Sequence, residues 1–84
     1  MNVAEANEPL ATGIAVTIAL KRLSKVQVAK AAGYNKQQFS DMLNGRKIIK
    51  PCDALAIAEA LNVTMNDLYE AGTKGRERME NWKL

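Results

Sequence analysis

The chain has 84 residues, of which 48% are apolar and 25% charged, a composition typical of one small globular domain. It contains no run of about 18 apolar residues, so we expect no membrane-spanning helix. Its single cysteine, Cys52, excludes an internal disulfide framework and suits a reducing, cytoplasmic setting.

The residue types that common catalytic and metal sites require are missing from the sequence. Without histidine there is no ordinary proton shuttle near neutral pH, and Cys52 has no second cysteine or histidine with which to form a nucleophile pair or a zinc site. No glycine-rich phosphate loop occurs either. We therefore expect no enzyme activity, no cofactor and no metal site.

The charge is distributed unevenly along the chain. The net charge is +3, but residues 21–50 hold eight Lys or Arg against one acid, Asp41, a net of +7. The other residues hold four bases and eight acids, a net of −4. A basic third within an otherwise acidic chain predicts a polyanionic partner; the alternative is a merely solvated basic surface.

Residues 1–9 are polar and are expected to be a flexible, frayed N-terminus. A helix is predicted to begin near Pro9 and Leu10, because proline is favoured in a first helical turn. The glycine at position 13 weakens this prediction. The residues expected to face the core are Leu10, Ile14, Ile18, Leu20 and Leu23.

Residues 24–45 are predicted to form two short helices joined by a tight turn. Ser24 is a favourable N-cap for a helix from about Lys25 to Ala32, which Gly33 ends by taking a left-handed conformation. Asn35 then caps a second helix that Gly45 ends. Val28, Ala29 and Ala32, and then Phe39, Met42 and Leu43, form the inner stripes. Such a pair is a helix-turn-helix, whose polar second helix suits the major groove of DNA.

Two further helices are predicted downstream. Pro51 opens the first, and Asn62 suits its left-handed C-terminal cap. Thr64 caps a short fifth helix from Met65 to Glu70, which Gly72 ends. The core residues expected here are Leu55, Ile57, Ala58, Leu61, Leu68 and Tyr69.

Residues 73–84 form a charged C-terminal extension carrying Met79 and Trp82. The extension is interpreted as a tail, or as a sixth helix that packs Trp82 within the monomer or across a dimer.

The sequence resembles the lambda-repressor-like (XRE, Cro/cI-type) helix-turn-helix family over about residues 14–72. The matching residues are Leu23-Ser24, Val28-Ala29, Gly33, Phe39, Leu43-Asn44-Gly45-Arg46-Lys47, Pro51, Leu55, Ile57-Ala58, Ala60-Leu61-Asn62-Val63 and Leu68-Tyr69. The resemblance implies an all-α, five-helix DNA-binding domain over residues 10–72, with its helix-turn-helix at 24–45.

The resemblance also implies roles for individual residues. The candidates for reading base edges are Lys36, Gln37, Gln38 and Asp41. The candidates for contacting phosphates are Lys25, Ser40, Asn44, Gly45, Arg46 and Lys47, including the main-chain amides that follow Asn44.

Several of these residues have competing interpretations. Gln38 is also the capping-box partner of Asn35, and Asn44 is also a helix C-cap. Asp41 could accept a hydrogen bond from cytosine, act against wrong sequences, pair with a nearby lysine or be a solvated charge. Ser40 could be a surface hydroxyl without a role.

The chain departs from the family pattern at three positions. Lys25 stands where the family usually has glutamine, so a phosphate contact remains possible but the amide bond to a neighbouring glutamine does not. Ile18 and Leu43 replace a buried Arg–Glu pair, and an apolar pair can be equally stable.

The resemblance implies a sequence-specific, double-stranded DNA-binding transcriptional regulator of phage or prokaryotic type, acting as a repressor. A homodimer is expected, because one short helix reads only a few base pairs. The alternative is a protein-interaction module of the same fold, such as an antitoxin or phage accessory protein. RNA binding is a weaker alternative, because the chain lacks an aromatic row for stacking bases.

Overall fold

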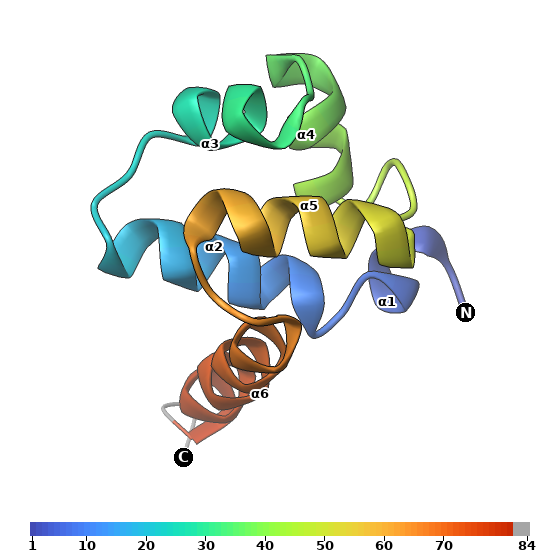
Figure 1. The fold of residues 1–84 in the computed structure, drawn as a ribbon. Coiled ribbons are helices and arrows are strands. Elements are labelled where there is room, and N and C mark those ends of the chain that lie inside the picture. Colours follow the sequence, from blue (N-terminus) through green and yellow to red (C-terminus); the bar gives the residue numbers. More distant parts are fainter. Residues whose placement is uncertain (82–84) are drawn as a thin grey trace.

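The computed structural model describes the backbone of residues 1–81 and the side chains of residues 1–75. Within this part the chain is all-α, without a strand, as the sequence predicted. Helices α3 and α4 lie together at one end of the molecule, α6 lies at the opposite end, and α2 and α5 lie between them (Figure 1). The helices are α1 (Val3–Ala6), α2 (Leu10–Leu20), α3 (Lys25–Ala32), α4 (Lys36–Leu43), α5 (Pro51–Leu61) and α6 (Met65–Asn81).

The ends of α3, α4 and α5 are set by local caps. The side chain of Ser24 accepts a hydrogen bond from the amide of Gln27, and Asn35 and Gln38 form a reciprocal capping box. Gly33, with φ of 90°, and Asn62, with φ of 58°, take the left-handed conformation that ends α3 and α5. These boundaries agree with the prediction from sequence because each depends only on nearby residues.

The core lies where α2, α3, α4 and α5 meet, and α6 contributes one fully buried side chain. The largest buried side chains are Phe39, Ile14, Met42, Ile57, Leu61 and Leu68. The prediction was wrong for Leu20, Leu23, Leu55 and Tyr69, which are 78%, 40%, 51% and 54% exposed. Leu23 lies beyond the end of α2. The other three each lie one or two positions after a buried residue, and one position turns a side chain by about 100° around the helix axis.

Helices α2 and α6 cross at two glycine residues, Gly13 and Gly72. A Cβ atom placed on Gly13 would lie 1.8 Å from the carbonyl oxygen of Leu68, and one on Gly72 would lie 1.9 Å from the carbonyl oxygen of Pro9. The two backbones therefore approach more closely than any side chain would permit.

The predicted short fifth helix ending at Gly72 was wrong. Helix α6 continues through Gly72 to Asn81, so residues 73–81 extend this helix and do not form a separate element. Gly72 is a helical residue. Glycine is needed there because a side chain would overlap the backbone at the start of α2, and not because the helix ends in a left-handed turn. Trp82 and the side chain of Met79 lie outside the described residues.

The N-terminal residues also differ from the frayed segment that the sequence predicted. Residues 3–6 form helix α1, which the side chain of Asn2 caps by accepting a hydrogen bond from the amide of Glu5 at 2.9 Å. Asn7, the next residue, is 1% exposed. Polar composition alone did not reveal this packing, because the partners of Asn7 lie 35 to 42 residues away in the sequence.

Candidate nucleic-acid interface

The basic side chains of residues 21–50 lie mostly on or next to helices α3 and α4. All eight basic side chains between residues 21 and 50 are exposed. Six of them lie in α3, in α4 or in the segment between α4 and α5. The only acid in this stretch, Asp41, is partly buried. The uneven charge seen in the sequence is therefore displayed on the surface and is concentrated around the helix-turn-helix.

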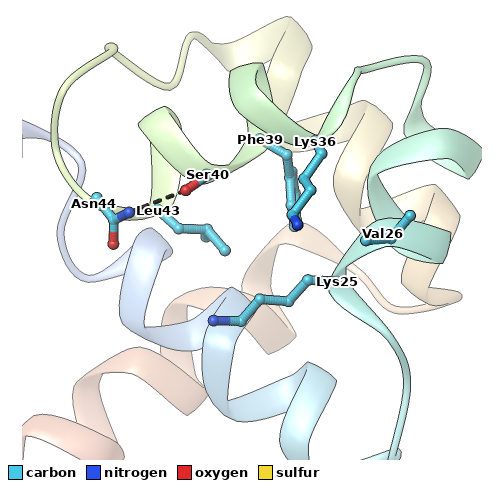
Figure 2. Close-up of a pocket in the computed structure, with 7 residues that line it drawn as sticks. All are labelled: Lys25, Val26, Lys36, Phe39, Ser40, Leu43 and Asn44. Atoms are coloured by element: carbon cyan, nitrogen blue, oxygen red, sulfur yellow. Dashed lines mark hydrogen bonds between the residues drawn. The ribbon is translucent and has the colours of Figure 1, made fainter.

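A hollow lies between the N-terminal end of α3 and the side of α4 that carries Lys36, Ser40 and Leu43 (Figure 2). Apolar side chains meet there with lysines and small polar groups. The lining residues are Lys25, Val26, Lys36, Phe39, Ser40, Leu43 and Asn44. Five of the seven were singled out from the sequence as functional candidates or as the replacement for the family's ion pair, and the structure brings them together.

The outer face of α4 carries a linked pair of polar side chains. The Nε2 atom of Gln37 donates a hydrogen bond to Oδ1 of Asp41 at 2.8 Å, one helical turn away. The same oxygen lies 3.8 Å from Nη1 of Arg46. The partners of Asp41 are therefore Gln37 and Arg46, where the sequence suggested a lysine.

The bond to Asp41 leaves Gln37 with most of its hydrogen-bonding capacity. A glutamine amide has two N–H donors and one acceptor oxygen, and the bond uses one donor. The remaining donor and the oxygen are the pair of groups that a glutamine uses to recognise adenine. Asp41 thus fixes the orientation of the Gln37 amide without consuming the groups that can read a base.

Gln38 is engaged in the capping box at the start of α4. Its Oε1 atom accepts a hydrogen bond from the amide of Asn35 at 3.0 Å, and its own amide donates to Oδ1 of Asn35 at 2.8 Å. The side-chain oxygen of Gln38 is therefore occupied, which leaves only its Nε2 group for any ligand.

The segment after α4 turns back on the helix end. Gly45 has φ of 77°, and the amides of Arg46 and Lys47 both donate to the carbonyl oxygen of Asp41, at 2.8 and 3.1 Å. These two main-chain amides, which the family resemblance placed near phosphates, thus have acceptors within the protein. The exposed side chains of Arg46 and Lys47 remain as the groups of this segment that can reach a ligand.

Asn44 and Ser40 are joined on the same side of α4. Asn44 is the C-cap of the helix, and its Nδ2 atom donates to Oγ of Ser40 at 3.1 Å (Figure 2). The C-cap interpretation of Asn44 is therefore correct. Its side-chain oxygen stays on the surface beside the hollow, so capping and ligand contact are compatible.

A brace between the turn and α5 was missed in the sequence. The hydroxyl of Tyr34 donates a hydrogen bond to Oδ1 of Asp53, whose other oxygen accepts from the amide of Lys50 at 3.0 Å. Burial, together with the bond to Asp53, raises the pKa of Tyr34 to about 12. The bond from Tyr34 lowers the pKa of Asp53. The signal available in the sequence was an aromatic residue inside the tight turn.

Cys52 is exposed at the start of α5. Among the described residues, no group of three or more acidic or cysteine side chains is arranged to hold a metal ion. No helix in this part of the chain is both long enough and apolar enough to cross a membrane.

Comparison with known proteins identifies the family. A family model described as a helix-turn-helix domain matches residues 11–72, nearly three quarters of the chain. Neither a curated protein nor a solved structure matches the chain significantly. The chain therefore belongs to the helix-turn-helix domain family, in agreement with its resemblance to the lambda-repressor-like group.

Proposed function

We propose that this protein is a sequence-specific, double-stranded DNA-binding regulator of phage or prokaryotic type, acting as a repressor, with α4 in the major groove. The observation that carries the proposal is the outer face of α4, where Lys36 and the held amide of Gln37 are exposed among basic side chains. A short helix with long polar tips fits the groove, and the surrounding positive charge suits the phosphates on either side.

Base reading is assigned first to Gln37 and Lys36. Gln37 would pair with adenine through the donor and acceptor that Asp41 leaves free, and Lys36 would donate to guanine. Asp41 acts mainly by holding Gln37, and its charge also disfavours a phosphate placed in the wrong register. Gln38 contributes at most its Nε2 group, because its oxygen completes the capping box.

Phosphate contacts are assigned to groups on both sides of α4. Lys25, at the first position of α3, would meet one strand together with the N-terminal end of that helix. Arg46 and Lys47 would meet the backbone through their side chains. Ser40 and Asn44, on the rim of the hollow, would contact it through neutral polar groups. Gly45 contributes through the turn that it permits.

We further propose that the protein acts as a homodimer in the cytoplasm, where its DNA target would be found. Two copies would read half-sites about 34 Å apart, one helical turn of DNA, which gives more specificity than one short helix can supply. Repression would then follow from occupancy of the site, and no catalytic activity or cofactor would be needed.

Selection of duplexes from a random pool tests this proposal. The expected result is an enriched motif with two related half-sites, bound at least about 10³-fold more tightly than unrelated DNA at physiological salt. If the pool yields no preferred duplex, the proposed function is wrong. The fold would then be better explained as a protein-interaction module, such as an antitoxin.

A further inference from the structure

A buried asparagine joins the N-terminal segment to the last turn of α4 and to the basic segment that follows it. The Nδ2 atom of Asn7 donates to the carbonyl oxygen of Met42 at 3.0 Å and to that of Lys47 at 2.9 Å. Its Oδ1 atom accepts from the amide of Ile49 at 2.8 Å. Met42 lies in the last turn of α4, whereas Lys47 and Ile49 lie in the segment that leads to α5.

Both side-chain N–H groups of Asn7 donate hydrogen bonds, and its side-chain oxygen accepts one. Serine, threonine and aspartate cannot supply two donors and one acceptor from a single short side chain. The site is also closed to water, since Asn7 is 1% exposed. If Asn7 were replaced, the carbonyl oxygen of Lys47 and the amide of Ile49 would lose this partner, whereas the carbonyl oxygen of Met42 would keep its bond from the amide of Gly45 at 3.5 Å. A buried polar group without a partner is costly.

A second contact from the same segment reaches the turn itself. A Cβ atom placed on Gly45 would lie 2.5 Å from Cβ of Ala4, so α1 lies directly against the backbone of Gly45. Ala4 and Asn7 thus contact residues 45–49, and the carbonyl of Asp41 also accepts hydrogen bonds from the amides of Arg46 and Lys47.

We propose that Asn7 is a positioning residue for DNA binding, which fixes the segment carrying Arg46 and Lys47 relative to α4. This inference rests on the DNA-binding function proposed above. Connecting segments are generally mobile, and a mobile cation loses conformational entropy when it is ordered on a phosphate. By bonding both to the last turn of α4 and to residues 47 and 49, Asn7 sets the distance between the phosphate-binding side chains and the base-reading face of α4 before DNA is bound.

The test compares Asn7→Ser with Thr17→Val in the full-length protein. Serine is neutral, so the change alters no charge near the DNA. Thr17 is also buried, and its hydroxyl donates to the carbonyl of Gly13 at 2.7 Å within α2, away from the basic segment. Thr17→Val therefore reports the effect of losing a buried side-chain hydrogen bond without disturbing residues 45–49. Affinity for the selected duplex is measured at several salt concentrations, below the unfolding temperature of each variant.

Asn7→Ser is expected to bind about tenfold more weakly, with a slope of log affinity against log salt smaller by about 1 to 2, because up to two phosphate contacts are lost. Thr17→Val should keep the wild-type affinity and slope. Adding Arg46→Ala and Lys47→Ala to Asn7→Ser should weaken binding much less than the same pair does in the wild type, since Asn7 acts through those side chains.

A folded Asn7→Ser that retains the wild-type affinity and slope would overturn the inference and leave DNA binding intact. If Asn7→Ser does not fold, Ala4→Leu decides, because it disturbs the contact with Gly45 at an exposed helical position. A smaller salt slope in Ala4→Leu supports the inference, and an unchanged slope contradicts it. Failure of the proposed function looks different, since the wild type itself would then prefer no duplex.

Discussion

Gly33 and Gly45 end the two helices of the helix-turn-helix, whereas Gly13 and Gly72 lie inside the helices that cross elsewhere in the molecule. The first two have φ of 90° and 77°, and a Cβ on Gly33 would meet nothing within 4 Å. The second two are helical, and a Cβ on either would overlap a backbone carbonyl of the facing segment. Glycine thus permits a left-handed backbone conformation in the helix-turn-helix, and it permits close backbone packing where α2 and α6 cross.

The difference separates what is determined locally from what depends on the whole chain. The helix-turn-helix is framed by caps whose partners lie within a few residues of each other, as in the capping box of Asn35 and Gln38. The crossing of α2 and α6 brings together backbones more than 50 residues apart, such as those of Gly13 and Leu68. Gly45 belongs to both classes, because its turn is left-handed and its Cα faces Ala4.

The crossing gives the largest expected loss of stability. Gly13→Ala should lower the free energy of unfolding by about 3 kcal/mol or more, because α2 and α6 must move apart and the packing around Leu68 opens. Urea unfolding followed by circular dichroism measures this loss. Alanine is the better helix former by about 1 kcal/mol, so a stabilised variant would show that the two helices do not approach as described.

The brace between the turn and α5 tests how the local frame is attached to the rest of the fold. Tyr34→Phe should cost about 2 kcal/mol near neutral pH, since it removes a hydrogen bond to a charged carboxylate. The difference in unfolding free energy between wild type and variant, measured in urea from acid to alkaline pH, gives this cost.

The same difference should depend on pH at both extremes. The pKa of Tyr34 is raised to about 12, so its contribution is complete below its ordinary pKa of about 10 and is lost as the pH rises toward 12. The pKa of Asp53 is lowered, so its contribution is complete above about 4 and is lost as the pH falls through its folded-state value. A cost that stays constant from pH 3 to pH 12 would argue against the bond.

Of the α2–α6 crossing, the Tyr34–Asp53 brace and the left-handed turn at Gly33, the turn should lose the least stability on substitution. Gly33→Ala should cost about 1 kcal/mol, because alanine is strained at positive φ while its Cβ finds open space. Gly33→Asn, which tolerates the left-handed region better, should recover part of the loss in the same urea measurement. If Gly33→Ala lowers the free energy of unfolding as much as Gly13→Ala does, the proposed difference between a glycine needed for its positive φ and a glycine needed for close packing is wrong.

The parts of the fold that the sequence predicted correctly are those that short-range chemistry determines. The bounds of α3 and α4 follow from Ser24, Gly33 and Asn35, and the exposed polar face of α4 follows from its helical period. The resemblance added the family, which the domain match confirmed. The roles proposed for individual residues at the DNA remain predictions.

The features that the sequence did not reveal depend on distant partners. Asn7 was interpreted as part of a polar, frayed N-terminus, because its three hydrogen-bond partners lie 35 to 42 residues away in the sequence. Gly72 was interpreted as a helix end, because the sequence alone does not distinguish a glycine that allows close helix packing from a glycine that ends a helix. Tyr34 lies in the turn before α4, and its partner Asp53 is 19 residues further along the chain.

The most direct test of the central claim is fluorescence anisotropy with the selected duplex and an unrelated one, at several salt concentrations, for wild type, Gln37→Ala and Lys25→Ala. Lys74→Ala, which removes the same charge from the exposed surface of α6, is the matched control for Lys25. Gln37→Ala should lower discrimination at one base pair by about 1–3 kcal/mol, while Lys25→Ala should weaken both duplexes alike and reduce the salt slope by about 0.9. Equal behaviour of Lys25→Ala and Lys74→Ala, with a sequence preference unchanged in Gln37→Ala, would contradict the proposed interface.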